Sequence, residues 1–270
     1  MPAVGDPPEG DWLGTPYLRF ERHGPLAHVV VDRPEARNAL TPAMYFGLRY
    51  AVDHVGRDDD LAGLLITGSG DVFMPGGDPW SNDDGWADLP TLLGMDNTPF
   101  EAVRRATKPV VCAVNGLCQG GGLVIAMLCD VAVASDRATF RAPELFRGIA
   151  DTNYGQVLPR QIGPARARDM LLTGRELSAA EAADWALVAR VVPHDELGDA
   201  AGDVLAQCCR TAPGARHEIK RAIHDYYGTY DRMAMDASLG GPEPAEGWAA
   251  FRERRSPSWV HPDLRRDGRL

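Results

Sequence analysis

Short apolar runs alternate with amphipathic stretches along the first two-thirds of the chain. Residues 17–21 and 26–31 are apolar or alternate with polar residues, which predicts an antiparallel hairpin. Thr41 and Pro42 begin a stretch that keeps apolar residues at helical spacing as far as Arg57, which predicts a helix. Further buried strands are predicted over residues 61–67, 109–114, 131–134 and 188–192. This order of elements predicts a mixed α/β fold.

The last third of the chain has a mainly helical pattern. Residues 165–173 and 178–185 are predicted to be helices. From Glu196 onward the apolar residues keep helical spacing, with breaks at residues 213–214 and 240–242. The domain organisation that we expect is a flexible N-terminal tail over residues 1–14, a core over residues 15–195 and a helical C-terminal region over residues 196–270.

Three consecutive glycines, Gly120 to Gly122, precede the apolar run over residues 123–128. Glycine costs roughly 1 kcal/mol relative to alanine inside a helix, so three glycines at a helix start suggest that backbone N–H groups are needed there. A helix N-terminus leaves its first amides unpaired and suits a carbonyl oxygen that becomes an oxyanion. The alternative is a tight crossing of a strand and a helix, and the glycine run alone is consistent with both interpretations.

Composition and charge restrict the classes of partner. The chain has 270 residues, of which 44% are hydrophobic, enough for one large domain. With 28 Lys and Arg residues against 38 Asp and Glu residues the formal net charge is -10, which argues against a nucleic-acid partner. The longest apolar stretch, residues 110–134, is interrupted by Asn115, Gln119 and Asp130, so no membrane span is predicted.

Cysteine and histidine usage bears on location and on metal binding. The five cysteines are odd in number and lie mostly in apolar stretches, which is typical of reduced thiols in a cytoplasmic protein. Residues 1–14 contain no apolar segment of the kind found in a signal peptide, so we expect no export by that route. The seven histidines show no paired ligand spacing, and no metal site is predicted.

A series of motifs occurs in one order along the chain. They are residues 32–40, residues 73–78, Lys108-Pro109, Asn115-Gly116 with the glycine run, Phe140, Pro143-Glu144, Leu172-Thr173-Gly174, Glu246-Gly247 and residues 251–257. In this order and spacing the chain resembles the crotonase family, the enoyl-CoA hydratase/isomerase superfamily, over about residues 16–258. Each motif is weak alone, and their common order makes the set specific.

The resemblance implies a fold, an assembly and a ligand. Members of this family have an α/β fold, a crotonase-like spiral of repeated strand-strand-helix units with a helical C-terminal region, and they form homotrimers or dimers of trimers. Their substrates are acyl-CoA thioesters, and no further cofactor is expected. By motif position, the two backbone N–H groups that hold the thioester oxygen fall on Gly77 and Gly121, and the residues that bind CoA are Ala36, Arg37, Gly76 and Asp78.

The resemblance also places the acid–base groups. Hydratases of this family have two glutamates, and the second is present here as Glu144, after Pro143. The first position matches Val124, which cannot exchange a proton. One carboxylate can take a proton from the α-carbon and return it to the γ-carbon, so this pattern favours enoyl-CoA isomerisation, while hydration stays open. The other interpretation of Glu144 is a surface carboxylate at the start of a helix or turn.

The region of the acyl pocket departs from the family pattern. Besides Val124, the residues expected there are Asp151, Thr152, Asn153 and Tyr154, which replace a loop rich in glycine and proline. They either make a turn or contact an oxygenated acyl chain. The main hypothesis is an enzyme that stabilises a thioester enolate. The alternatives are a hydrolase or carbon–carbon bond-cleaving enzyme that acts on an oxygenated acyl substrate, and a non-catalytic acyl-CoA-binding protein.

Overall fold

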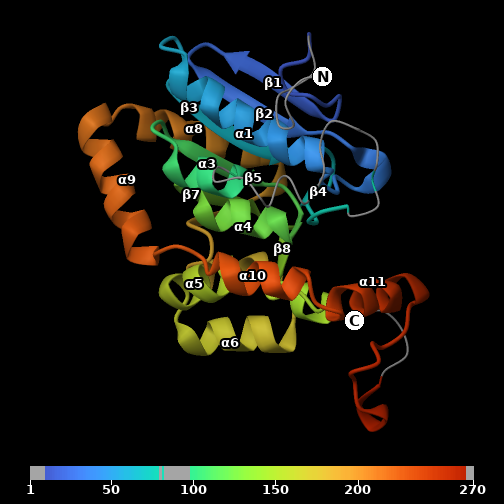
Figure 1. Cartoon of the computed structure of the whole chain (residues 1–270). Helices are drawn as coiled ribbons and strands as arrows, with labels where there is room; N and C mark the ends of the chain where they lie inside the picture. Colours follow the sequence, from blue (N-terminus) through green and yellow to red (C-terminus); the bar gives the residue numbers. More distant parts are fainter. Residues whose placement is uncertain (1–9, 79–80, 82–97, 266–270) are drawn as a thin grey trace. The chain divides into compact units, whose positions relative to one another are not determined.

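A computed structural model of the chain describes residues 10–78, 81 and 98–265 (Figure 1). These residues form two compact units. The first unit consists of Met1–Phe140 and Leu177–Tyr226, and the second unit consists of Arg141–Glu176 and Tyr227–Leu270. Of the expected N-terminal tail, residues 10–14 are described, and Leu13 is buried. Residues 1–9 lie outside the described residues.

A six-stranded sheet forms the centre of the first unit. Its strand order is β1-β2-β3-β5-β7-β10, in which β1 and β2 are antiparallel and the other neighbours are parallel. The bounds of its strands are β1 (Leu18–His23), β2 (Leu26–Val31), β3 (Gly63–Gly68), β5 (Val110–Val114), β7 (Val131–Ser135) and β10 (Arg190–Val192). The predicted hairpin and all four predicted buried strands are therefore confirmed. Apolar runs are expected here because parallel strands are covered on both faces.

A second, four-stranded sheet has the order β4-β6-β8-β9. Its strands are β4 (Val72–Met74), β6 (Leu117–Gln119), β8 (Thr139–Arg141) and β9 (Leu177–Ser178). Three consecutive strand pairs, β3-β4, β5-β6 and β7-β8, each place their first strand in the large sheet and their second in the small one. A helix follows each of the first two pairs, α3 (Pro99–Arg105) and α4 (Gly121–Leu128). This is the repeated strand-strand-helix unit that the sequence resemblance implied.

Helices cover the large sheet of the first unit. Helix α1 (Pro42–Arg57) starts at the predicted place, with Thr41 as the residue that caps it. The Thr41 Oγ1 accepts a hydrogen bond from the Met44 N–H. The other helices described in this unit are η1 (Pro34–Ala36), α7 (Ala179–Asp184), η3 (His194–Glu196), α8 (Leu197–Cys209) and α9 (Pro213–Tyr227). Helix α8 packs Ala201 and Leu205 against Val111 and Val133 of the sheet. A buried ion pair of 2.7 Å between Lys220 and Asp130 fixes α9.

The second unit is helical. Its elements are η2 (Glu144–Arg147), α5 (Thr152–Gln161), α6 (Pro164–Thr173), α10 (Arg232–Leu239), α11 (Glu243–Glu253) and η4 (Pro262–Leu264). Helix α11 lies close to η2, because a Cβ on Gly247 would be 2.6 Å from the Arg147 Cα. Helix α5 was not predicted, and the sequence indicated only a turn or loop at its start. Among the described residues, no helix is both long enough and apolar enough to cross a membrane.

Asn38 joins the loop before α1 to the turn between β3 and β4. Its side chain is buried, with 1% of the residue exposed. Its Oδ1 accepts a hydrogen bond from the Arg33 N–H at 3.0 Å, and its Nδ2 donates to the Val72 carbonyl at 2.7 Å and to the Ser69 carbonyl at 3.0 Å. The backbone of Asn38 is left-handed, with a φ of 61°. These bonds give the loop one position relative to the sheets.

We expect Asn38→Ala to lower the free energy of unfolding by about 3 kcal/mol, because each buried polar group that loses its partner costs roughly 1–3 kcal/mol. The shift in the midpoint of urea unfolding measures this loss. Ser69→Ala is the control, since the Ser69 Oγ makes only a long contact of 3.4 Å with Asn38, and it should cost less than about 1 kcal/mol. Equal midpoints for the two variants would contradict the prediction.

Candidate active site

The loop after β4 is held by the backbone of Leu40. The Leu40 N–H donates to the Gly76 carbonyl at 2.9 Å, and the Asp78 N–H donates to the Leu40 carbonyl at 2.8 Å. These bonds make a single parallel bridge between Leu40 and Gly77. In such a bridge the flanking residues supply the bonding groups, so the Gly77 N–H points away from Leu40. Gly77 is an exposed residue.

Arg33 fixes the other side of the same loop. Its Nη1 donates to Asp78 Oδ2 at 2.9 Å and to the Ala39 carbonyl at 3.0 Å. Arg33 is buried, so this charged pair is shielded from water and is stronger than a pair on the surface. The Asp78 carboxylate, predicted to be near CoA, therefore has a structural partner within the protein. It positions the loop that contains Gly77.

The glycine run crosses β4 at close range. Gly120 precedes α4 with a φ of 58°. A Cβ on Gly122 would lie 3.0 Å from the Met74 carbonyl carbon, and a Cβ on Gly76 would lie 3.2 Å from the Gly120 Cα. The tight crossing that the sequence left open is therefore present. It brings the loop of Gly77 and the start of α4 together within the first unit.

Gly121 differs from its two neighbours because it is the first residue of α4. A first helical residue has no acceptor for its N–H inside the helix, and the partial positive charge of the helix end adds to that N–H. In the part of the chain that the structure describes, neither the Gly121 N–H nor the Gly77 N–H has a hydrogen-bond acceptor. Two unoccupied backbone donors, one on each glycine segment, therefore lie in the same region of the first unit.

Helix α4 supplies no acid or base. Val124, where hydratases carry a glutamate, is fully buried with 0% of its surface exposed. Asp130 follows the helix, and its Oδ2 accepts hydrogen bonds from the Val110 N–H and the Lys220 Nζ, both at 2.7 Å. Asp130 is thus a structural carboxylate. The contact of Val124 with an acyl chain stays a prediction.

The predicted catalytic glutamate lies at the start of η2 in the second unit. The Tyr154 hydroxyl donates to Glu144 Oε1 at 3.2 Å. The second carboxyl oxygen, Oε2, is buried and has no hydrogen-bond partner among the described residues. Burial raises the pKa of Glu144 to about 8, and the nearby charge of Asp151 contributes in the same direction. Glu144 is therefore a largely protonated carboxyl at neutral pH, with one oxygen available.

Asp151 begins helix α5 next to Glu144. Its Oδ1 accepts hydrogen bonds from the Asn153 backbone N–H at 3.0 Å and from the Asn153 Nδ2 at 2.9 Å. Burial raises the pKa of Asp151, while the hydrogen bonds from Asn153 lower it. Thr152 Oγ1 donates to the Asp231 carbonyl at 2.8 Å. Of the four predicted pocket residues besides Val124, Asp151 and Tyr154 act on Glu144, and Asn153 and Thr152 fix the start of the helix.

The predicted CoA residues lie on two loops, with Ala36 and Arg37 before α1 and Gly76 and Asp78 after β4. Ala36 ends η1 and is partly buried, whereas Arg37 is exposed and has a left-handed backbone with a φ of 53°. Gly76 has a φ of +103°, a conformation that favours glycine. Their contact with CoA stays a prediction. Arg37 lies shortly before Leu40 in the sequence, on the loop that the side chain of Asn38 fixes.

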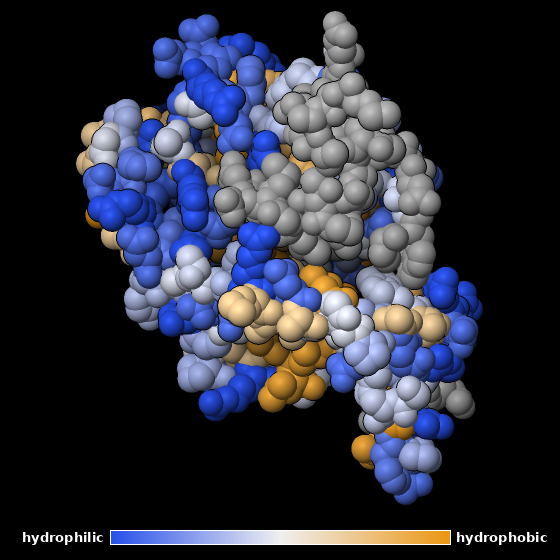
Figure 2. Space-filling model, in the orientation of Figure 1, coloured by the Kyte–Doolittle hydropathy of each residue, from blue (hydrophilic) through white to orange (hydrophobic). Residues whose placement is uncertain are grey.

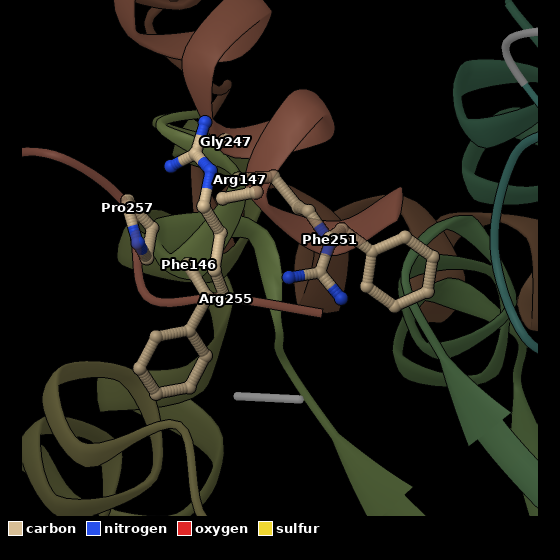
Figure 3. Close-up of a pocket in the computed structure, with 7 residues that line it drawn as sticks. Phe146, Arg147, Gly247, Phe251, Arg255 and Pro257 are labelled. Atoms are coloured by element: carbon tan, nitrogen blue, oxygen red, sulfur yellow. The ribbon is translucent and has the colours of Figure 1, made fainter. Parts of the chain in front are cut away.

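A small hollow in the second unit is lined by Phe146, Arg147, Phe251 and Arg255 (Figure 3). The Arg147 guanidinium lies 3.9 Å from the centre of the Phe251 ring. Arg255 makes a bidentate ion pair with Glu246, with N···O distances of 2.6 and 3.0 Å. The charge of Arg255 is therefore compensated within the unit, and its main role is to tie α11 to the residues that follow it.

Comparison with known proteins identifies the family. A family model described as enoyl-CoA hydratase/isomerase matches residues 21–262. The probable enoyl-CoA hydratase echA8 of Mycobacterium tuberculosis is 33% identical over 256 residues, which cover 90% of this chain and 98% of that protein. The carnitinyl-CoA dehydratase of Salmonella arizonae is 32% identical over 266 residues, which cover 90% of this chain and 97% of that protein.

A solved structure agrees with this match. The crystal structure of an enoyl-CoA hydratase/isomerase from Pseudoalteromonas atlantica has a TM-score of 0.78 and 29% identity, covering 90% of this chain and 100% of that one. The chain belongs to the enoyl-CoA hydratase/isomerase family, an enzyme family, and it has the crotonase fold. The sequence resemblance is thus confirmed at the level of family and fold.

We expect two substitutions beside Glu144 to move its pKa in opposite directions. Asp151→Asn removes a negative charge that disfavours ionisation, so the pKa of Glu144 should fall below about 8. Tyr154→Phe removes a hydrogen bond that favours the carboxylate, so the pKa should rise. NMR titration of carbon-labelled glutamate measures both values, and Glu144→Gln identifies the signal. Shifts of the same sign in the two variants would contradict this account of the electrostatics.

Proposed function

We propose that the protein is an acyl-CoA-processing enzyme of the enoyl-CoA hydratase/isomerase type, in which the Gly77 and Gly121 N–H groups hold the thioester oxygen. The observation that carries the proposal is a pair of N–H donors, on two adjacent glycine segments, that have no acceptor among the described residues. Removal of an α-proton from a thioester places negative charge on its oxygen, as an enolate. Each prealigned donor is typically worth about 10²- to 10³-fold in rate.

Glu144 is the proposed acid–base group. In a 3-enoyl-CoA the ionised carboxylate takes a proton from the α-carbon, the electrons move to the thioester oxygen, and the resulting carboxyl returns the same proton to the γ-carbon. The product is a 2-enoyl-CoA, and no cofactor is consumed. The raised pKa supports this role, because a more basic carboxylate is a better match for a weakly acidic carbon acid. The absence of a carboxyl side chain in α4, where Val124 stands, favours isomerisation over hydration.

A second reaction is supported by Asp151. Two buried carboxyl groups whose charges interact can divide the roles of acid and base, as hydration, hydrolysis or carbon–carbon bond cleavage of an oxygenated acyl group requires. The carnitinyl-CoA dehydratase among the relatives has a name that specifies an oxygenated acyl group. The second reaction would give a different pattern of turnover in the variants described below. The same holds for the alternative of a non-catalytic acyl-CoA-binding protein.

The proposal includes the assembly and the location. A homotrimer or a dimer of trimers follows from the family, and large apolar side chains on the second unit support it: Leu145, Leu172 and Met233 are 44%, 72% and 84% exposed. Figure 2 shows apolar surface around α10. Light scattering after size-exclusion chromatography measures the mass of the assembly. We further propose that the enzyme is cytoplasmic, and that Ala36, Arg37, Gly76 and Asp78 lie against CoA.

Glu144→Gln should lower turnover of both 3-enoyl-CoA and 2-enoyl-CoA substrates by about 10²- to 10⁴-fold, because glutamine can neither take nor return a proton. Coupled spectrophotometric assays of the purified protein measure this loss. Glu176→Gln, which changes an exposed glutamate of the same unit, should leave turnover unchanged. Full activity in Glu144→Gln would remove Glu144 from the mechanism. Loss of activity in Asp151→Asn alone would support the second reaction.

The pH dependence should distinguish a base from an acid. If the carboxylate starts the reaction, kcat/KM rises about tenfold per pH unit below the pKa of Glu144 and levels above about 8. If the protonated carboxyl starts it, the rate is level below about 8 and falls above it. Initial rates with 3-enoyl-CoA across this range measure the profile. The falling profile would contradict isomerisation that begins with the carboxylate.

A further inference from the structure

The side chain of Tyr45 on α1 lies between the two glycines that present the free N–H groups. Its ring carbons Cε1 and Cζ would be 3.0 Å from a Cβ on Gly121, and its Cε2 would be 3.8 Å from a Cβ on Gly77. The two carbons that flank the phenol carbon thus face different glycines. The hydroxyl oxygen at the end of the ring overlaps the position that a Cβ on Gly121 would take, and it is 3.5 Å from that position on Gly77.

These contacts bound the distance from the hydroxyl to the two N–H groups. A Cβ lies about 2.5 Å from the nitrogen of its own residue. The Tyr45 hydroxyl is therefore within about 5 Å of the Gly121 nitrogen and within about 6 Å of the Gly77 nitrogen. These bounds place the hydroxyl in the immediate surroundings of both N–H groups, where an acceptor oxygen held by both at about 2.9 Å would also lie.

We propose that the Tyr45 hydroxyl is a third hydrogen-bond donor to the thioester oxygen, beside the Gly77 and Gly121 N–H groups. The inference rests on the proposed function of that glycine pair. As negative charge develops on the oxygen, the hydroxyl shortens its hydrogen bond and keeps its proton. Tyr45 is then a catalytic residue, and the oxyanion site contains two backbone donors and one side-chain donor. A neutral phenol suits this task because it adds no charge to the free site.

The backbone pairing that orients Gly77 also sets the position of the Tyr45 hydroxyl. Leu40 bridges Gly77, and Thr41 immediately begins α1, so Tyr45 follows after one helical turn. The Tyr45 N–H donates to the Thr41 carbonyl at 3.1 Å. The ring packs edge-on against Phe100 of α3 with a centroid distance of 5.8 Å and an interplanar angle of 72°. Tyr45 is 7% exposed, so its ring is held by packing on several sides.

The alternative interpretation is that the Tyr45 ring has a structural role only and fills the space beside Gly121. The position of the ring explains why residue 121 is a glycine, since a Cβ there would collide with the ring and the hydroxyl. The packing interpretation requires the aromatic ring, whereas donation to the thioester oxygen requires the hydroxyl. Tyr45→Phe separates the two interpretations, because it keeps the ring and removes that oxygen.

The test uses the full-length protein and acetoacetyl-CoA, a thioester that forms an enolate with near-ultraviolet absorbance. The apparent pKa of the bound ligand reports how well the site stabilises an oxyanion, independently of turnover. We expect Tyr45→Phe to reduce the ionisation constant of the bound ligand by about tenfold to 10²-fold, and kcat by a similar factor with little change in KM. Tyr50→Phe, which changes another tyrosine further along α1, is the matched control and should change neither.

The outcomes separate this inference from the proposed function. If the wild-type protein neither binds nor ionises acetoacetyl-CoA, the proposed function fails. If the wild-type protein ionises the ligand and Tyr45→Phe does so equally well, the oxyanion site stands and the role of Tyr45 is overturned. The thermal unfolding midpoint of Tyr45→Phe checks folding. A variant that unfolds like the wild type and has lost enolate stabilisation supports the third donor.

Discussion

The pairing of the Leu40 backbone with the loop around Gly77 is the interaction on which the rest of the first unit's site depends. It uses the carbonyl of Gly76 and the N–H of Asp78, and it leaves the N–H of Gly77 outside the bridge. The Arg33–Asp78 ion pair and the buried side chain of Asn38 hold the two segments in this position. Because α1 begins at the next residue, the same pairing also sets the position of Tyr45.

In the second unit, opposing effects of burial, charge and hydrogen bonding set the pKa of Glu144. Burial penalises the charged form of Glu144, and Asp151 adds to that penalty, whereas the Tyr154 hydroxyl favours the carboxylate. Burial is the largest of these effects, so the carboxyl holds its proton at neutral pH until it is lost near pH 8. Because the unfolded chain releases this proton at the ordinary glutamate pKa, the contribution of Glu144 to stability falls as the pH rises from that value to about 8, and the loss is complete above it. The group therefore combines reactivity with a local cost in stability, as acid–base groups at functional sites commonly do.

Local signals in the sequence predicted much of the fold. The hairpin of β1 and β2 and helix α1 have regular periods and recognisable ends, and the ordered motifs identified the family. Helix α5 was missed because it contains Gly155 and Pro159, and its helical pattern appears only once Tyr154 and Leu158 are buried. The position of the Tyr45 hydroxyl could not be read from the sequence either. It depends on Gly77 and Gly121 meeting in space, which is a long-range property of the fold.

The three glycines that looked equivalent in the sequence have separate physical roles. Gly120 has a left-handed φ of 58°, which a side chain would oppose. Gly122 faces the backbone of Met74, which cannot move aside without shifting β4. Gly121 faces the ring and hydroxyl of Tyr45, and it begins the helix with an N–H that has no acceptor among the described residues. Backbone conformation therefore accounts for Gly120 and packing for Gly122, and the middle glycine is the one that we propose as an oxyanion donor. The two interpretations of the run apply to different residues within it.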